Sequence, residues 1–222
     1  MLPDAVHHPH HPALAHQFDS LAQQSEAATL GMWVFLVTEV LFFGGLFCTY
    51  TIYRGWYPEA FAAASHELDV TLGAINTAVL ITSSLTMALA VHAAQLGQRK
   101  LLMILLVLTM ALGASFLGIK SVEYYQKFAE HHVPGPSFQF EKEYVRHAQI
   151  FFSLYFMMTG LHALHMVIGL GIMLVMLGLA WRGTITPEYY SPIEISGLYW
   201  HFVDIVWIFL FPLLYLLGRH GP

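Results

Sequence analysis

The sequence predicts an all-α protein, a polytopic membrane helix bundle with about five transmembrane helices. Of its 222 residues, 57% are hydrophobic and only 10% are charged, whereas soluble domains carry about 25% charged residues. The apolar residues also come in several runs that reach the roughly 20 residues a helix needs to cross a bilayer. Too little polar surface is left for a water-facing globule, and no block of Lys and Arg indicates a nucleic-acid partner.

The apolar runs divide the chain into a short tail and one membrane domain. Residues 1–28 form a polar N-terminal tail rich in His and Pro, and residues 29–222 form the transmembrane domain. The predicted spans, in chain order, cover residues 30–53, 71–94, 101–125, 148–181 and 195–217. The tail does not resemble a signal peptide, because the first Lys or Arg in the chain is Arg54. Residues between the first two spans read as a polar loop.

Five spans place the two termini on opposite sides of the membrane. If the N-terminus is cytoplasmic, the inner segments hold Arg99, Lys100 and Arg182. The outer segments then hold the larger set of cations, namely Arg54, Lys120, Lys127, Lys142, Arg146 and Arg219. The positive-inside rule therefore slightly favours an external N-terminus.

Glu39 is the one formal charge in the first apolar run. Its neighbours three and four positions away on a helix are Phe35, Leu36, Phe42 and Phe43. A carboxyl group in such surroundings is expected to be membrane-buried and protonated near neutral pH, because a charge there is costly. It could handle protons, or it could be a hydrogen-bonded buried acid with a structural role.

Two further pairs of ionisable residues lie within predicted spans. His162 and His165 stand one helical turn apart on the fourth span, and His201 and Asp204 stand one turn apart on the fifth. Each spacing places both residues on one helix face. Pairs on facing helices could build a metal site or supply a haem ligand. Alternatively, the imidazoles bond across helices and Asp204 holds His201.

The tail contains a cluster of histidines: His7, His8, His10, His11 and His16. Such a cluster can bind metal. A flexible tail that binds metal only adventitiously is the simpler interpretation.

Motifs on the first three spans resemble subunit III of the haem–copper terminal oxidases. The segment from Trp33 to Phe43 looks like the family helix that carries a buried, carbodiimide-reactive glutamate, which corresponds to Glu39 here. The segment from Asn76 to Thr86 looks like the next family helix. Phe116-Leu117-Gly118 followed by Glu123-Tyr124 is similar to the third shared segment.

The last two spans carry the most specific matches. Residues 159–165 match the family signature Thr-Gly-x-His-x-x-His, and residues 199–207 are close to its C-terminal signature. The chain resembles the short, five-helix bacterial form, because it lacks the first two helices of the mitochondrial-type subunit. Lipid-binding residues on those two helices therefore cannot be carried over.

The resemblance implies a bundle that flanks the catalytic subunit I, assembles with subunit II and binds phospholipid in a cleft. Haem and copper belong to the partner subunits, so it implies no cofactor, metal or catalytic residue in this chain. The implied role is to stabilise the catalytic subunit during turnover, support proton uptake and offer oxygen a lipid route. It also implies a bacterial inner membrane and a cytoplasmic N-terminus, which we adopt over the charge count.

Two alternatives stay open at this point. The chain could be the counterpart in a quinol oxidase or a homologue associated with nitric oxide reductase. It could instead be a proton-coupled transporter that uses Glu39 and Asp204, although no broken-helix substrate site is evident. The sequence does not decide the electron donor, the oxidase subtype or membership of a larger respiratory supercomplex.

Overall fold

Helices account for nearly all of the chain that the structure describes. The structure is a computed structural model, and it describes residues 14–141 and 143–217. Five of the helices are long and apolar enough to cross a membrane, which confirms the predicted fold class. The elements are α1 (Leu21–Trp56), α2 (Pro58–His66), α3 (Val70–Gln95), α4 (Arg99–Ala129), α5 (Val145–Arg182), α6 (Ser191–Phe211) and the π-helix η1 (Pro212–Leu216) that continues α6.

Capping residues explain where several helices begin and end. The hydroxyl of Ser20 accepts a hydrogen bond from Gln23 N at 3.2 Å, so α1 starts well before its apolar run. The carboxylate of Asp69 accepts from two backbone amides of the first turn of α3. Gly183, with a φ of 81°, ends α5 in the left-handed conformation that glycine adopts at little cost.

Two local expectations differ from the structure. The tail predicted for residues 1–28 overlaps the first turns of α1, because helical structure begins at Leu21. The expected loop after α1 contains the short helix α2, which has Pro58 in its first turn and four alanines. Proline at a helix start and an alanine-rich segment both favour a helix. His7, His8, His10 and His11 lie outside the described residues.

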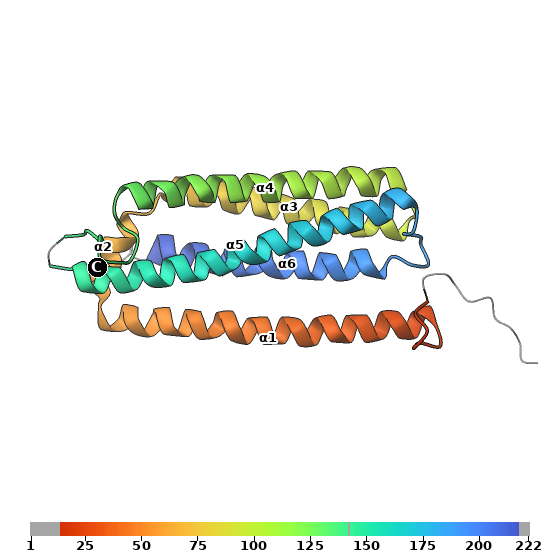
Figure 1. Ribbon diagram of the computed structural model, residues 1–222, viewed down its shortest axis with the longest axis horizontal. Coiled ribbons are helices and arrows are strands. Elements are labelled where there is room, and N and C mark those ends of the chain that lie inside the picture. Colours follow the sequence, from red (N-terminus) through yellow and green to blue (C-terminus); the bar gives the residue numbers. More distant parts are fainter. Residues whose placement is uncertain (1–13, 142, 218–222) are drawn as a thin grey trace, which may run out of the picture.

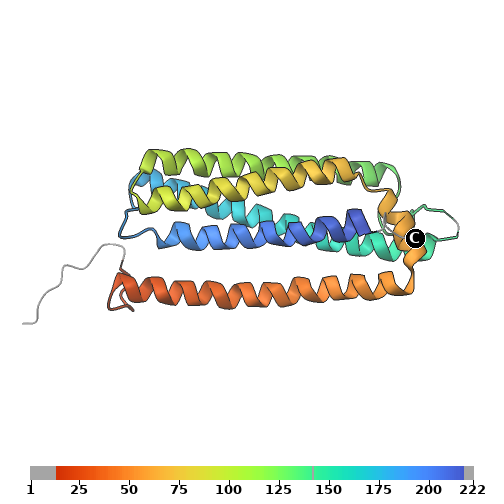
Figure 2. The same ribbon diagram turned by 180° about the vertical axis from the view of Figure 1, so that it is seen from behind.

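α3, α4, α5 and α6 form a bundle, and α1 runs along one side of it (Figure 1). Seen from behind, α6 lies between α3 and α1, as its contacts with both helices require (Figure 2). Only 11% of the most apolar stretch of α1 is buried, compared with 56% for α6. α6 is therefore the central helix, while most of α1 is left to face lipid or a partner. We call the two ends of the bundle the N-terminal end, where α1 begins, and the α2 end.

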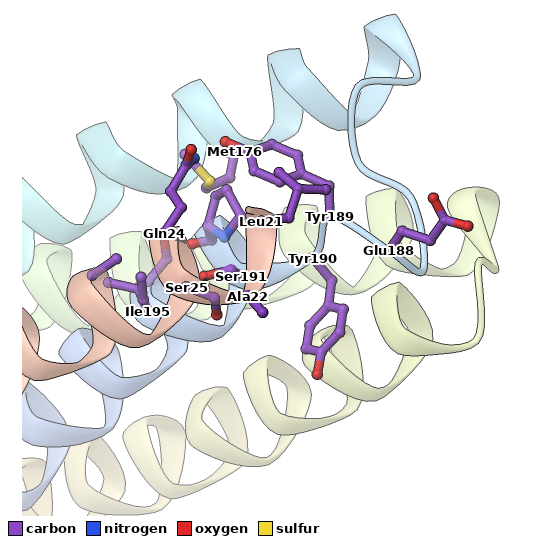
Figure 3. A pocket seen from close by; sticks show the side chains of 13 residues that line it. Leu21, Ala22, Gln24, Ser25, Met176, Glu188, Tyr189, Tyr190, Ser191 and Ile195 are labelled. Atoms are coloured by element: carbon purple, nitrogen blue, oxygen red, sulfur yellow. Dashed lines mark hydrogen bonds between the residues drawn. The ribbon is translucent and has the colours of Figure 1, made fainter. Parts of the chain in front are cut away.

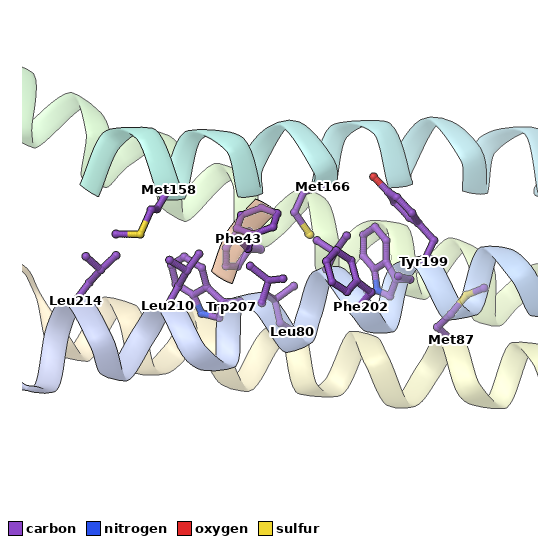
Figure 4. Close-up of a cluster of buried hydrophobic side chains, with 14 of the residues drawn as sticks. Phe43, Leu80, Met87, Met158, Met166, Tyr199, Phe202, Trp207, Leu210 and Leu214 are labelled. Carbon is purple, nitrogen blue, oxygen red and sulfur yellow. The ribbon is translucent and has the colours of Figure 1, made fainter. Parts of the chain in front are cut away.

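Trp200 lies at the centre of the bundle, where glycines admit its ring. A Cβ atom at Gly113 of α4 would approach that ring to 2.7 Å, and one at Gly169 of α5 would approach it to 2.8 Å. Any larger residue at either position would displace the indole. Methionine and aromatic side chains continue this core along α6 (Figure 4).

Candidate functional site

Glu39 and His165 form a contact between α1 and α5. Glu39 Oε2 lies 3.3 Å from His165 Nε2, and the two side chains are 19% and 13% exposed. His165 Nδ1 lies 2.8 Å from the carbonyl oxygen of Leu161, which can only accept, so Nδ1 carries a proton. The Nε2 atom is therefore the ring nitrogen that faces the Glu39 carboxyl group. The pair lies about halfway along α1, in the interior of a spanning helix.

His162 faces a different part of the bundle from His165. Its ring is 1% exposed and packs against Phe116 of α4 and Trp207 of α6, with centroid distances of 5.4 and 5.2 Å. Neither ring nitrogen has a hydrogen-bond partner among the described residues. The one-turn spacing therefore does not bring His162 and His165 to one shared site.

The expected hydrogen bond between His201 and Asp204 is absent, and that expectation was wrong. His201 Nδ1 lies 2.6 Å from the hydroxyl of Ser84 on α3. Asp204 is 2% exposed, and within residues 14–141 and 143–217 neither carboxyl oxygen has a hydrogen-bond partner of good geometry. Ser84, His201 and Asp204 together line a cavity of about 250 Å³ between α3 and α6. Asp204 thus points at a small space beside Ser84 and not at its neighbour in sequence.

The structure does not bring the two pairs together as one set of ligands. In the described part of the chain, three or more ligating groups come together only at Glu67, Glu130 and His132, at the α2 end. None of the residues proposed from spacing belongs to that group. The spacing identified helix faces correctly, but it could not say which helices those faces would meet.

The α2 end also contains a buried charged cluster that helix spacing did not predict. Lys120 Nζ lies 3.0 Å from Glu123 Oε2, and these residues are 4% and 1% exposed. Lys120 Nζ also donates to the hydroxyls of Tyr155 at 3.2 Å and Tyr215 at 2.7 Å. Both hydroxyls in turn donate to Glu123 Oε1. Every charged atom of the cluster therefore has a partner within this chain.

The spacing of Lys120 and Glu123 in the sequence was a signal for this cluster. Lys120 and Glu123 are one turn apart at the end of an apolar run, but Lys120 was counted only as an outer cation and Glu123 was named only in a family motif. Their tyrosine partners come from α5 and η1, so the cluster joins three elements. It holds the α2 end of the bundle together.

Two hollows lie beside α1. The first, of about 560 Å³, opens at the N-terminal end between α1, α5 and the start of α6 (Figure 3). There Ser25 donates a 3.2 Å hydrogen bond to Ser191 and ties α1 to α6. The second, of about 450 Å³, is a groove between α1 and α6 that is lined by apolar side chains and His201. None of the other residues proposed from the sequence lines either hollow.

Comparison with known proteins gives consistent matches. A family model described as cytochrome c oxidase subunit III matches residues 17–219. Cytochrome c oxidase subunit 3 of Thermostichus vulcanus is 34% identical over 209 residues, which cover 90% of this chain and 92% of that protein. Quinol oxidase subunit 3 of Bacillus subtilis is 36% identical over 194 residues, with 86% and 88% covered. Cytochrome bo(3) ubiquinol oxidase subunit 3 of Pseudomonas aeruginosa is 29% identical over 205 residues, with 92% of each covered.

Proposed function

Because the chain belongs to the cytochrome c oxidase subunit III family of the haem–copper oxidases, we propose that it is a supporting and not a catalytic subunit of such a complex. The observation that carries this proposal is the distribution of its buried polar groups. Glu39 and His165 join α1 to α5, whereas His162 packs against α4 and α6. These groups connect helices and do not converge on one reacting centre. Haem and copper, and with them oxygen reduction, belong to partner subunits I and II in this proposal.

The groove between α1 and α6 supports a lipid-binding role. Its walls are contributed by Trp33, Phe43 and Phe47 on one side and Phe202 and Phe209 on the other. A volume of about 450 Å³ with almost no polar lining suits an acyl chain and not a polar metabolite. We assign the groove to a phospholipid acyl chain, which would fix the loosely packed α1 against the bundle.

The Glu39–His165 pair supports a role in proton uptake. The Glu39 carboxyl group lies 3.3 Å from His165 Nε2, and both side chains are mostly buried in the interior of spanning segments. Ionisable pairs at such depth are typical of proton-handling groups. Glu39→Gln keeps the shape of the protonated acid but removes the exchangeable proton, so it separates proton handling from structural support.

Ion pairs seen in the structure change the count of cations on which the orientation of the chain was judged. Two of the cations counted outside are neutralised in the structure, because Lys120 pairs with Glu123 and Lys127 pairs with Glu130. Removing these two cations from the count weakens the argument for an external N-terminus. We propose a bacterial inner membrane location with the N-terminus in the cytoplasm. Reporter fusions after the last helix, active only outside, would test that orientation.

The test of the proposed function is gentle purification of the chain from its native membrane, followed by a reduced-minus-oxidised spectrum and oxygen-consumption assays with cytochrome c and with quinol. We expect haem-bearing partners, and the active donor decides between the two kinds of oxidase that the relatives represent. The Glu39→Gln complex should assemble normally and lose activity faster during turnover. A chain that purifies without haem-bearing partners would contradict the proposal and favour the transporter alternative.

A further inference from the structure

Asp204 lies at the middle depth of the membrane-spanning bundle. The spanning segment that contains it is Ser191–Leu216, and Asp204 is close to its midpoint. Ser84, which lines the same cavity from α3, is likewise close to the midpoint of its helix. Lipid headgroups and bulk water begin about 15 Å from the centre of a bilayer. At this depth the carboxyl group can meet only protein or acyl chains.

The described part of the chain does not supply the hydrogen bonds that this carboxyl group needs. Asp204 is 2% exposed, and neither of its oxygens has a hydrogen-bond partner among the described residues. The hydroxyl of Ser84 lies 2.6 Å from His201 Nδ1 and is engaged in that bond. Buried polar groups are normally paired, so the structure calls for a further partner at Asp204.

The cavity beside Asp204 opens at the surface of the bundle and has isoleucines at its edge. Ile81 of α3 and Ile205 and Ile208 of α6 are 54%, 50% and 45% exposed. Acyl chains could cover these isoleucines, but they carry no group that donates or accepts a hydrogen bond. A protein helix can cover them with apolar side chains and also bring a polar side chain to Asp204.

The chemistry of the cavity favours a neutral partner group. No Lys or Arg lines the cavity in the described part of the chain, and an ionised carboxyl group without a counter-ion is costly at this depth. A neutral carboxyl group has one O–H that donates and one carbonyl oxygen that accepts. Hydroxyl and primary amide side chains match it, because each of them can both donate and accept.

The hydroxyls on the outer surface of this chain at the same depth are already engaged. Near the midpoints of α1, α3 and α4, the exposed hydroxyls belong to Thr38, Thr82 and Ser115. Each donates to a carbonyl oxygen of its own helix, at 2.6, 2.8 and 2.8 Å respectively. A second copy of this chain is therefore a poor source of the missing group, and a different chain is the better one.

We propose that this face of α3 and α6 docks a transmembrane helix of a partner subunit, and that a hydroxyl or amide side chain of that helix bonds Asp204. The inference rests on the proposed function for the existence of partner subunits. It adds the face at which one of them is held and the residue that it contacts.

The first arm of the test locates the partner in the native membrane. A photo-cross-linking amino acid replaces Ile208 in one variant and Leu164 in its control, which is 53% exposed near the midpoint of α5. The Ile208 variant should cross-link to one partner subunit, and the Leu164 variant should cross-link to that subunit far less. A cross-link from Leu164 with none from Ile208 would overturn the proposal, and so would a cross-link from Ile208 to a second copy of this chain.

The second arm detects the hydrogen bond itself by infrared spectroscopy of the purified complex. Asp204→Asn lacks the carboxyl group and so identifies the Asp204 band, which should be that of a neutral acid. Replacing the hydroxyl or amide side chain of the cross-linked helix by alanine should move this band to higher wavenumber, because the C=O group loses a hydrogen bond. An ionised Asp204, or a band that does not move, would contradict the proposal.

The outcomes separate this inference from the proposed function. Haem-bearing partners that cross-link through Leu164 and not through Ile208 would leave the proposed function standing and overturn this inference. A cross-link from Ile208 to a partner in a complex without haem would contradict the proposed function and support the docking face.

Discussion

Glu123 and Asp204 are both carboxyl groups buried within spanning helices, with 1% and 2% of their surfaces exposed, but their surroundings differ. Glu123 receives an ammonium and two phenol hydroxyls, all from this chain. Asp204 has no hydrogen-bond partner of good geometry among the described residues and faces a small cavity beside Ser84. Buried polar groups are normally paired, so the second arrangement requires an explanation.

The comparison separates a buried carboxyl group whose hydrogen bonds are all supplied by this chain from one whose hydrogen bonds are not. The cavity at Asp204 is bordered by Ile81, Ile205 and Ile208, which are 54%, 50% and 45% exposed. Ser84 and His201 also line this cavity, and they bond each other at 2.6 Å. The exposed isoleucines around it fit a partner transmembrane helix that brings a hydrogen-bond donor to Asp204. The Glu123 cluster is completed within the subunit, whereas Asp204 is left for a hydrogen-bond donor from outside the described residues.

The largest expected effect is at Glu123. Glu123→Ala leaves the Lys120 ammonium buried without its counter-ion, and breaking such a pair costs about 3–5 kcal/mol of folding free energy. The double variant Lys120→Met with Glu123→Met removes both charges. It should recover most of that loss, because the hydroxyls of Tyr155 and Tyr215 converge on one point and can bond each other. The measurement is the free energy of unfolding of the purified subunit in detergent.

If the double variant is as unstable as Glu123→Ala, then stranded charge is not the cause of the loss. The role of the cluster would then lie outside subunit stability.

An intermediate effect is expected at Asp204. Its substitution should stabilise the isolated chain or leave it unchanged, but should weaken the attachment of the chain to the complex. In the isolated chain, Asp204→Leu removes an unpaired buried acid, so the free energy of unfolding should stay the same or rise. In the complex, the same change removes the carboxyl group that would accept a hydrogen bond from the partner's donor. This should cost about 1–3 kcal/mol, or roughly 5- to 150-fold in retention of the subunit.

Retention is measured by quantifying this subunit in the purified complex, with initial oxygen consumption as the second readout. Ile208→Leu, a change on the rim that keeps its apolar character, is the matched control and should have little effect. A complex that keeps Asp204→Leu fully bound but loses initial turnover would place Asp204 in the reaction path and not in an interface.

The helices could be predicted from the sequence because their signal is local. A run of apolar residues long enough to cross a bilayer is visible without knowing its neighbours, and all five predicted spans correspond to observed helices. The start of α1 was missed because its first turns are polar and depend on the Ser20 cap. Helix α2 was missed because it is too short to produce an apolar run.

The partners of buried polar groups could not be predicted, since they depend on how the helices assemble. His201 shares a helix face with Asp204 yet bonds Ser84, which is 117 residues away in sequence. Lys120 bonds Tyr215 across 95 residues. Spacing on one helix fixes a direction in space, but the group that lies in that direction belongs to another helix. Four of the five proposed residues do contact other helices, while Asp204 faces a cavity.

The smallest expected effect is at His132, which lies outside the spans at the α2 end. Its side chain is 12% exposed, stacks on Phe152 at a centroid distance of 5.0 Å and lies 3.3 Å from Glu130. Burial, and then the Lys127 ammonium, lower the pKa of His132 below its ordinary 6.5. The unfolded segment therefore binds a proton more readily than the folded one, so local stability is lost as pH falls from about 6.5 toward the lowered value.

This loss should appear as faster hydrogen exchange at Gln139, whose amide donates to the carbonyl of His131 at 3.0 Å in the same loop. After correction for intrinsic exchange, protection at Gln139 should decrease between pH 7 and pH 5. His132→Phe keeps a ring against Phe152 but cannot titrate, so its protection should be independent of pH. His131→Asn, which tolerates the φ of 56° at that position, should behave like the wild type. A pH-dependent loss that persists in His132→Phe would show that His132 is not the group responsible.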